Sequence, residues 1–438
     1  MAPRSSSQRR TAAAAPAATS ENSVGHRAER IDTQPPGPTG TRTSADARRI
    51  LLTRGLRGFA DGLVSVLLAG YLTRLGFTPL QVGAVVTGTL LGSAALTIAL
   101  GLAGHRLDRR PVLLGASFLM LATGIGFAGT VAFWPLLIVA VLGTLNPSAG
   151  DVSVFLPTEQ AALAQTTSGD QRTRLFAWYN VTGNFSGALG SLASGVPALV
   201  AHAYGFDVVA AERSGFVLYA LVGIASAIVY VGLGRSVEAR GATGGRPLAR
   251  SRRIVVHLAT LFSLDSFGGG FVVQSLLVLW LYQRFQLSVE IAGAVFFAAG
   301  TLGALSQLVS PVLAARIGLV RTMVYTHLPA NLLLIAAGLV PSAPVAVAFL
   351  LLRASLSQMD VPVRQAFVMA VVPPEERAAA SSVTNVPRSL AAAVPPLVTG
   401  AMLSHSAVGW PLVCGGLLKV VYDLLLLAQF RAVSPSAE

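Results

Sequence analysis

The sequence predicts an all-α membrane protein in which twelve helices cross a lipid bilayer. Of its 438 residues, 53% are hydrophobic and only 12% are charged, about half the charged share of a typical soluble domain. The hydrophobic residues fall in runs of about 20, the length that an α-helix needs to cross the hydrocarbon core. Helix is expected because lipid cannot satisfy backbone N–H and C=O groups.

The hydrophobic runs follow one another along the chain, separated by short segments rich in Gly, Pro or Arg. We place the spans at residues 50–74, 80–104, 111–130, 133–157, 174–201, 214–233, 254–283, 290–315, 320–340, 344–370, 378–403 and 409–430. Loops on one side hold most of the arginines, among them Arg109, Arg174, Arg252, Arg316 and Arg377, whereas loops on the other side hold only Arg74, Arg213 and Arg284. By the positive-inside rule, both termini are expected in the cytoplasm.

The chain is expected to form two bundles of six helices, at residues 48–233 and 254–431. A Gly- and Arg-rich segment at 234–253 follows the sixth span and has the composition of a flexible linker. Residues 1–47 are rich in Ala, Ser, Thr, Pro and Arg without a hydrophobic run, so we expect a disordered cytoplasmic tail. Residues 432–438 form a second, short cytoplasmic tail.

Internal similarity supports this division, because the second half repeats features of the first. Matching positions at a nearly constant spacing are Arg74 and Arg284, Gly83 and Gly293, Arg106 and Arg316, and Asn180 and Asn385. Repeated halves are common among membrane transporters, whose substrate sites lie between them. The pattern therefore predicts a duplicated six-helix unit.

Several classes of function are not supported by the sequence. The net charge of +13 does not indicate nucleic acid, because the arginines lie in alternate loops. The six histidines show no metal-ligand spacing, and no phosphate-binding loop or hydrolase triad is visible. We expect no enzyme activity, cofactor or metal, and an ion gradient as the energy source. The expected partners are a small-molecule substrate, the proton and the bilayer, with the protein a monomer.

Acidic side chains inside hydrophobic spans carry most of the functional information. They are Asp61, Asp151, Glu159, Asp265, Asp360 and Asp423. A charge near the centre of a bilayer costs a few kcal/mol, so it is normally kept for a pathway, a proton relay or a gate. We expect Asp61, Asp151, Asp265 and Asp360 to line a central cavity. The amide side chains expected beside them are Asn180, Asn184, Gln274 and Asn385.

Two acids stand four residues from a base on the same predicted helix. Arg57 precedes Asp61 in the first span, and Arg364 follows Asp360 in the tenth. This spacing places the two side chains of each pair side by side on a helix. Asp61 would lie near mid-depth, and it is our candidate for the proton-binding group. The alternative is a permanent ion pair with Arg57 that only orients the first span.

Three further charged positions are expected near the inner ends or the periphery of the bundles. Glu159 and Arg364 occupy matched positions of the two halves, so they are expected to pair as an inner gate. Arg388 is a competing partner for Glu159, and the alternative is that each residue faces the lipid headgroups. Lys419 and Asp423, four residues apart in the last span, are expected to form a structural pair.

The loop between the second and third spans contains a motif. It reads GLAGHRLDRRP, from Gly101 to Pro111, and includes His105, Arg106, Asp108, Arg109 and Arg110. It resembles the loop signature of the major facilitator superfamily, in which an acid and an arginine precede a glycine and two bases. His105 stands at the usual position of the acid and Asp108 at that of the glycine. The alternative is a basic loop that only sets topology.

The resemblance covers residues 48–431 and implies two pseudosymmetric six-helix bundles that work by alternating access. The glycine-rich run at 183–199 is similar to the antiporter signature of that superfamily, although Val196 separates Gly195 from Pro197. We therefore favour proton-coupled export of a small amphipathic drug-like compound or metabolite.

Two alternatives remain. One is proton symport of an anionic or sugar-like nutrient, bound by Arg57, Arg364 and Arg388. The other is a sensor or scaffold that transports nothing. The excess of Arg over Lys indicates a bacterial protein of the cell membrane.

Overall fold

The computed structural model describes residues 45–103, 107–148, 154–166, 170–234 and 251–430, together with Val237 and Leu248. The regular structure within these ranges is helical, and no strand occurs in them. Ten helical segments of this described part are long and apolar enough to cross a membrane. This confirms the predicted fold class of an all-α membrane protein.

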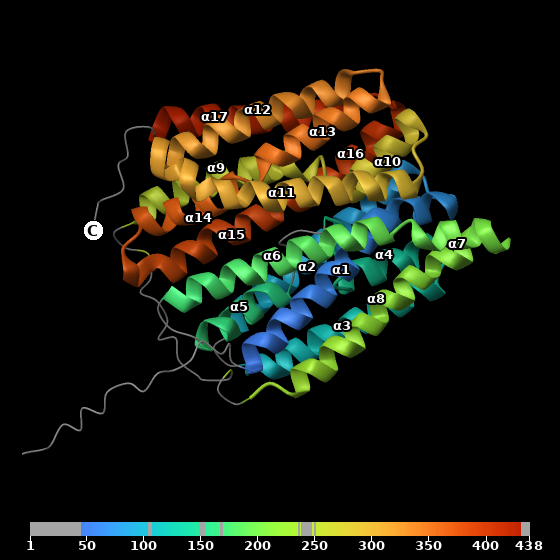
Figure 1. The fold of residues 1–438 in the computed structure, drawn as a ribbon, viewed down its shortest axis with the longest axis horizontal. Helices are drawn as coiled ribbons and strands as arrows, with labels where there is room; N and C mark the ends of the chain where they lie inside the picture. Colours follow the sequence, from blue (N-terminus) through green and yellow to red (C-terminus); the bar gives the residue numbers. More distant parts are fainter. Residues whose placement is uncertain are drawn as a thin grey trace, which may run out of the picture. The chain divides into compact units, whose positions relative to one another are not determined.

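The helices follow the predicted spans closely (Figure 1). The first half contains α1 (Ala45–Arg74), α2 (Pro79–Ala103), α3 (Arg109–Gly129), α4 (Phe133–Leu142), α5 (Phe155–Gln165), α6 (Asp170–Ala193), α7 (Val196–Tyr204) and α8 (Val208–Val231). The second half contains α9 (Arg252–Gly270), α10 (Gln274–Phe285), α11 (Val289–Ile317), α12 (Leu319–Leu339), α13 (Ala343–Ser357), α14 (Asp360–Val371), α15 (Arg377–Ala393), α16 (Pro395–His405) and α17 (Trp410–Phe430).

Several spans consist of two helices in succession. The segments Arg252–Phe285, Ala343–Val371 and Val383–His405 each contain a break and are each long and apolar enough to cross as one span. If α4 with α5 and α6 with α7 are counted in the same way, the total is twelve. The count of twelve and the boundaries of the two bundles remain predictions.

The fourth span was expected to be one helix over residues 133–157, and this expectation was wrong. Helix α4 ends at Leu142, and Gly143 to Ser148 are not helical. Pro147 explains the break, because a proline disfavours the helical conformation of the residue before it. Side chains replace the missing helical bonds: the Tyr219 hydroxyl donates to the Thr144 carbonyl at 2.8 Å, and the Ser275 hydroxyl donates to the Pro147 carbonyl at 2.8 Å. Such replacement is what allows irregular backbone inside a membrane protein.

Glycines allow α1 and α6 to pack closely. A Cβ atom on Gly62 would lie 1.9 Å from the carbonyl oxygen of Gly187, and one on Gly190 would lie 1.9 Å from the carbonyl oxygen of Phe59. Small residues at such spacing let membrane helices approach. The corresponding pair of the second half, α9 and α15, also packs together, which fits a duplicated unit.

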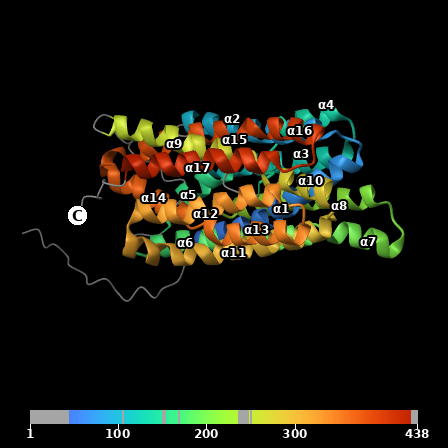
Figure 2. The same ribbon diagram turned by 90° about the horizontal axis from the view of Figure 1, so that it is seen from above.

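The two halves meet through contacts of α1 with α10 and along two further seams (Figure 2). Helix α2 packs on α15 and α16, and α6 packs on α11. At the first seam, a Cβ atom on Gly83 would lie 3.0 Å from the Cα atom of Gly400. At the second, a Cβ atom on Gly293 would lie 2.9 Å from the Ser194 hydroxyl. These contacts lie near the starts of α2 and α11 and near the ends of α6 and α16, so the two halves touch at that end of the interface.

Candidate functional site

A buried carboxylate, Glu159 of α5, organises the interior of the first half. It is fully buried and contacts the Arg57 guanidinium as an ion pair. Three hydroxyls also donate to it: those of Thr53 at 2.9 Å, Tyr179 at 2.6 Å and Tyr230 at 2.5 Å. We call these five residues the Glu159 cluster. A buried carboxylate with this many donors is well satisfied.

The predicted pairing of Arg57 with Asp61 is not formed. Although the two residues stand four apart on α1, the Arg57 side chain points to α5, where it contacts Glu159 and lies 4.0 Å above the Phe155 ring. Glu159 is a fully buried carboxylate that also accepts hydrogen bonds from three hydroxyls, whereas no described residue donates to Asp61, so the pair with Glu159 is the better satisfied of the two. The alternative that Asp61 is permanently paired with Arg57 therefore has no support in the geometry.

Asp61, unlike Glu159, has no hydrogen-bond or ion-pair partner among the described residues. Its side chain is 9% exposed, and no described residue donates a hydrogen bond to it or forms an ion pair with it. The charged groups that act on it are Arg57 and Arg54, both on α1. Each other buried acid of the described residues has a partner, namely Glu159, Glu212, Asp265, Asp360, Glu376 and Asp423.

Sequence reasoning missed Arg54, which lies beside the Glu159 cluster. Arg54 is 7% exposed, and its guanidinium carbon lies 5.0 Å from the centroid of the Tyr179 ring. It forms no ion pair or hydrogen bond with the described residues. The spacing in the sequence could have indicated this residue, because Arg54 precedes Asp61 by two helical turns and both therefore lie on one face of α1.

A second buried cluster joins four spans of the second half. Asp265 of α9 accepts hydrogen bonds from Lys419 at 2.6 Å and Arg364 at 3.0 Å. Arg364 also lies 3.3 Å from Asp360, so the predicted pairing of Asp360 with Arg364 is present. His327 of α12 lies 3.8 Å from Asp265.

The same cluster extends to the last helix. His327 lies 2.9 Å from Asp423, and the Asn331 amide donates to Asp423 at 2.8 Å. Asp423 therefore contacts partners on α12, whereas Lys419 donates a hydrogen bond to Asp265 on α9. The predicted pair of Lys419 with Asp423 is not formed, because partners on other helices satisfy both groups. We call this group the Asp265 cluster; its seven members are Asp265, His327, Asn331, Asp360, Arg364, Lys419 and Asp423.

The predicted gate pair of Glu159 with Arg364 is not formed in this structure. Each residue belongs to a different cluster and is satisfied within its own half. Arg388, the competing partner, donates to the Ser266 hydroxyl at 3.1 Å and to the Asn385 side-chain oxygen at 3.3 Å. Charges that are paired within one half are not available for pairing across the interface.

The candidate cavity residues with amide side chains do not form one group. Gln274 donates to the Ser191 hydroxyl at 3.1 Å and so links α10 to the end of α6 across the two halves. Asn385 and Asn180 are exposed, whereas Asn184 is half-buried. Asp151, also expected to line the cavity, lies outside the described residues.

The loop motif is described only in part. His105 and Arg106 lie outside the described residues, and Gly101 is in the last turn of α2. Asp108 precedes α3 without capping it through its side chain. Arg109 donates to the Val237 carbonyl at 2.8 Å, and Arg110 is half-buried. Arg109 thus links this loop to the segment that follows α8.

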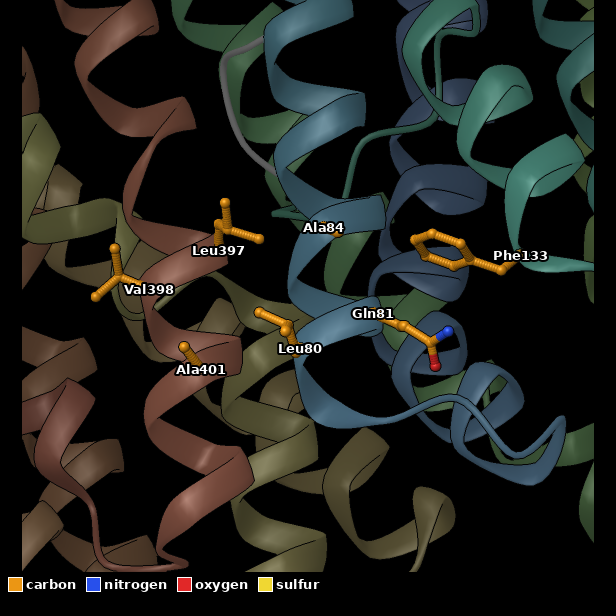
Figure 3. A pocket seen from close by; sticks show the side chains of 7 residues that line it. All are labelled: Leu80, Gln81, Ala84, Phe133, Leu397, Val398 and Ala401. Carbon is orange, nitrogen blue, oxygen red and sulfur yellow. The ribbon is translucent and has the colours of Figure 1, made fainter.

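An apolar groove lies on a different part of the protein (Figure 3). Helices α2, α4 and α16 form it, and its lining consists of Leu80, Gln81, Ala84, Phe133, Leu397, Val398 and Ala401. None of these residues belongs to either charged cluster, and Gln81 is the one polar side chain among them. The groove therefore offers an apolar surface and no group for proton exchange.

The helical spans and the buried charges between them define a multi-pass membrane protein with the fold of a secondary transporter. A profile of the Major Facilitator Superfamily matches residues 50–396. The chain therefore belongs to the major facilitator superfamily, as the loop motif and the repeat predicted. Its structural neighbours are transporters as well, and the protein is not an enzyme.

Known proteins share this fold at low sequence identity. An uncharacterized membrane protein of Saccharomyces cerevisiae is 23% identical over 428 residues, which cover 89% of this chain and 95% of that protein. The structure of a D-xylose-proton symporter has a TM-score of 0.70 at 15% identity and covers 87% of this chain and 97% of its own.

Two further solved structures are similar over nearly the same region. The nucleoside transporter NupG has a TM-score of 0.67 at 14% identity, covering 89% of this chain and 100% of its own. The human organic anion transporter MFSD10 has a TM-score of 0.59 at 19% identity, covering 87% of this chain and 100% of its own. At these identities, the likeness shows the fold alone.

Proposed function

We propose that the protein is a secondary active transporter that couples the movement of a small amphipathic compound to protons, with Asp61 as the proton-binding group. The observation that carries this proposal is that Asp61 lacks a partner, whereas every other buried acid in the described part of the chain has one. An unpaired carboxylate is costly to bury as an anion and much less costly as a neutral acid. Binding of a proton to Asp61 therefore has a different free energy in conformations that bury or expose this residue, and proton coupling requires such a difference.

Export is the first form of this function. In that form, substrate and proton compete for the site around Asp61 and are carried in opposite directions by alternating access. The neutralised arginines fit this form, because Arg57 and Arg364 already have carboxylate partners and are not available for an anionic substrate. The apolar helix faces suit a compound with a hydrophobic body.

Uptake by proton symport is the second form, and it requires a base that no acid neutralises. Arg57 and Arg364, which the sequence suggested for this role, are both paired, and Arg388 contacts Ser266 and Asn385. Among the buried arginines and lysine that the structure describes, Arg54 meets the requirement. In either form, the arginine-rich loops support a position in the cell membrane with cytoplasmic termini.

The test uses purified protein in liposomes that contain a pH-sensitive dye. Compounds that stabilise the protein against heat are added outside, and the internal pH is followed. Export by antiport raises the internal pH as the compound enters and protons leave, whereas symport lowers it. Asp61→Asn is expected to abolish the pH change.

The matched control is Asp207→Asn, because Asp207 caps α8 from an exposed position and asparagine caps helices equally well. This variant is expected to behave like the wild type. If Asp61→Asn still moves protons with the compound, or if the wild type moves none with any stabilising compound, the proposal is wrong. The second result would favour a sensor or scaffold.

A further inference from the structure

We propose that Arg54 binds the anionic group of the transported substrate, which is an organic carboxylate, and that a proton on Asp61 strengthens this binding. This inference rests on the proposed role of Asp61 and adds to it the substrate class and the direction of coupling.

The first observation is that Arg54 lacks an acidic partner. Three arginines and one lysine are buried among the described residues, namely Arg54, Arg57, Arg364 and Lys419. The last three each contact a carboxylate. Arg54 contacts none, and its Nε atom is buried without a hydrogen-bond partner. A buried charge without a partner is costly, so a protein that keeps one has a use for it.

Arg353 of α13 is the arginine in a membrane span that most resembles Arg54 in its lack of hydrogen bonds. Its Nε atom is also without a hydrogen-bond partner, but the side chain is half-buried rather than buried. Asp265 is the acid that acts on it, and it belongs to a cluster with other bases. Arg54 differs because the acid near it is Asp61, the proposed proton-binding group.

The second observation is that the surroundings of Arg54 hold its guanidinium in place. The Tyr179 ring lies 5.0 Å from the guanidinium carbon, and the Tyr179 hydroxyl is itself fixed by Glu159. A Cβ atom on Gly183 of α6 would lie 2.1 Å from the Arg54 Nε atom. Glycine at 183 therefore makes the space that the guanidinium occupies. A fixed guanidinium with free N–H donors matches the two oxygens of a carboxylate.

The third observation is the balance of charge. Arg54 and Arg57 face two acids, Glu159 and Asp61, so this region is neutral when Asp61 is ionised. A proton on Asp61 leaves one positive charge in excess, and a bound carboxylate restores neutrality. In a region of low dielectric, this makes the binding of the proton and of the anion mutually favourable. Ligands that favour each other's binding travel together, so the inference selects the symport form.

The experiment compares two neighbouring glycine variants of α6. Gly183→Ala places a methyl group against the Arg54 side chain, whose atoms are its three nearest neighbours, and so displaces the guanidinium without removing its charge. Gly187→Ala is the matched control, because its Cβ atom would lie 3.4 Å from the Gly58 carbonyl oxygen, an ordinary contact. Arg54→Gln and Arg54→Lys complete the set.

Binding is measured on the purified full-length protein by thermal stabilisation. The probes are benzoate, 2-naphthoate and decanoate, each beside its methyl ester. We expect at least one acid to stabilise the wild type while its ester does not. Arg54→Gln and Gly183→Ala should weaken this binding by about 10- to 100-fold, as expected for the loss of charge-assisted hydrogen bonds. Gly187→Ala should bind as the wild type does, and Arg54→Lys should bind with intermediate affinity.

The role of the proton is tested with the same probes at several pH values. Acid binding to the wild type should strengthen as the pH falls, and Asp61→Asn, which resembles the protonated state, should bind tightly at every pH. The inference is overturned if acids and esters bind alike, if no acid binds, or if Arg54→Gln binds as the wild type does. The proposed function fails separately, if Asp61→Asn leaves proton movement unchanged.

Discussion

Arg57 stands four residues from Asp61 on α1, yet it pairs with Glu159 on α5. Residues four apart on an exposed helix stabilise each other by a few tenths of a kcal/mol. In the interior of a helix bundle, an acid on another helix can supply a partner that is shielded from water, and three hydroxyls then satisfy its other lone pairs. The result at the residue scale is that Asp61 has no partner and becomes the candidate proton site.

A first prediction concerns Glu159. The substitution Glu159→Gln leaves Arg57 buried without a counter-charge, which is expected to destabilise the protein by about 3–5 kcal/mol. The apparent melting temperature of the purified protein measures this effect. Arg57→Met added to Glu159→Gln should recover part of the loss, because no unpaired charge then remains. An equal loss in the single and the double variant would show that the ion pair is not the cause.

At the scale of the element, glycines determine how closely α1 and α6 approach, and prolines and glycines determine where spans break. The break after α4 matters for the site because it exposes the Thr144 carbonyl to Tyr219 of α8. Tyr219 in turn lies in the electrostatic environment of Asp61. An irregular segment thus lies near the proposed proton site, where irregular backbone in transporters is often found.

A second prediction tests the packing of α1 on α6. Gly62→Ala would place a Cβ atom 1.9 Å from the Gly187 carbonyl oxygen, so the helices must separate. We expect a loss of about 1–3 kcal/mol or more, seen as a lower apparent melting temperature. The control is Gly115→Ala in α3, where no atom lies within 4 Å of the new Cβ atom. That variant should be neutral or slightly stabilising, because alanine favours helix. Equal effects of the two substitutions would contradict the packing account.

At the scale of the whole molecule, the charged clusters lie within the halves, whereas the seams between halves use small residues and uncharged hydrogen bonds. This arrangement suits halves that move as units, because no ion pair of the described residues joins the two halves and would have to break when they rock against each other. The contacts of Gly83 with Gly400 and of Gly293 with Ser194 join the halves at the end where α2 and α11 begin. Alternating access requires that this end also opens.

A third prediction tests that opening. The substitutions Ser194→Cys and Gly293→Cys, in a Cys414→Ala background, place two thiols across the seam between α6 and α11, where the Ser194 hydroxyl and a Cβ atom on Gly293 would be 2.9 Å apart. A Cβ atom on Gly293 would also lie 2.5 Å from the Ser191 carbonyl oxygen, so the backbone must shift there, and the reduced double variant is the reference for transport. Oxidation should form a disulfide and stop transport, and reduction should restore it. Each single cysteine variant should be insensitive to oxidant. Undiminished transport by the fully cross-linked protein would show that this seam does not open.

The sequence alone determined the class of the protein, the position of nearly every span and the membership in the major facilitator superfamily. The physical reason is that these features depend on local quantities. The length of a hydrophobic run decides whether a helix can cross the bilayer, and the loop from Gly101 to Pro111 is a contiguous motif. The interruption at Pro147 was also visible as a proline in the fourth span, although its effect on the helix was not foreseen.

The tertiary structure decided most of the pairs of charges, whereas spacing along the helix correctly predicted one of them, Asp360 with Arg364. The pairings of Arg57 with Asp61, of Lys419 with Asp423 and of Glu159 with Arg364 were expected from spacing or symmetry, and none of them forms. The contacts of His327, Asn331 and Arg54 are all with residues on other helices, so they could not be read from the sequence of one helix. A buried ion is stabilised by whatever donors the surrounding helices supply, and the spacing along one helix does not contain that information.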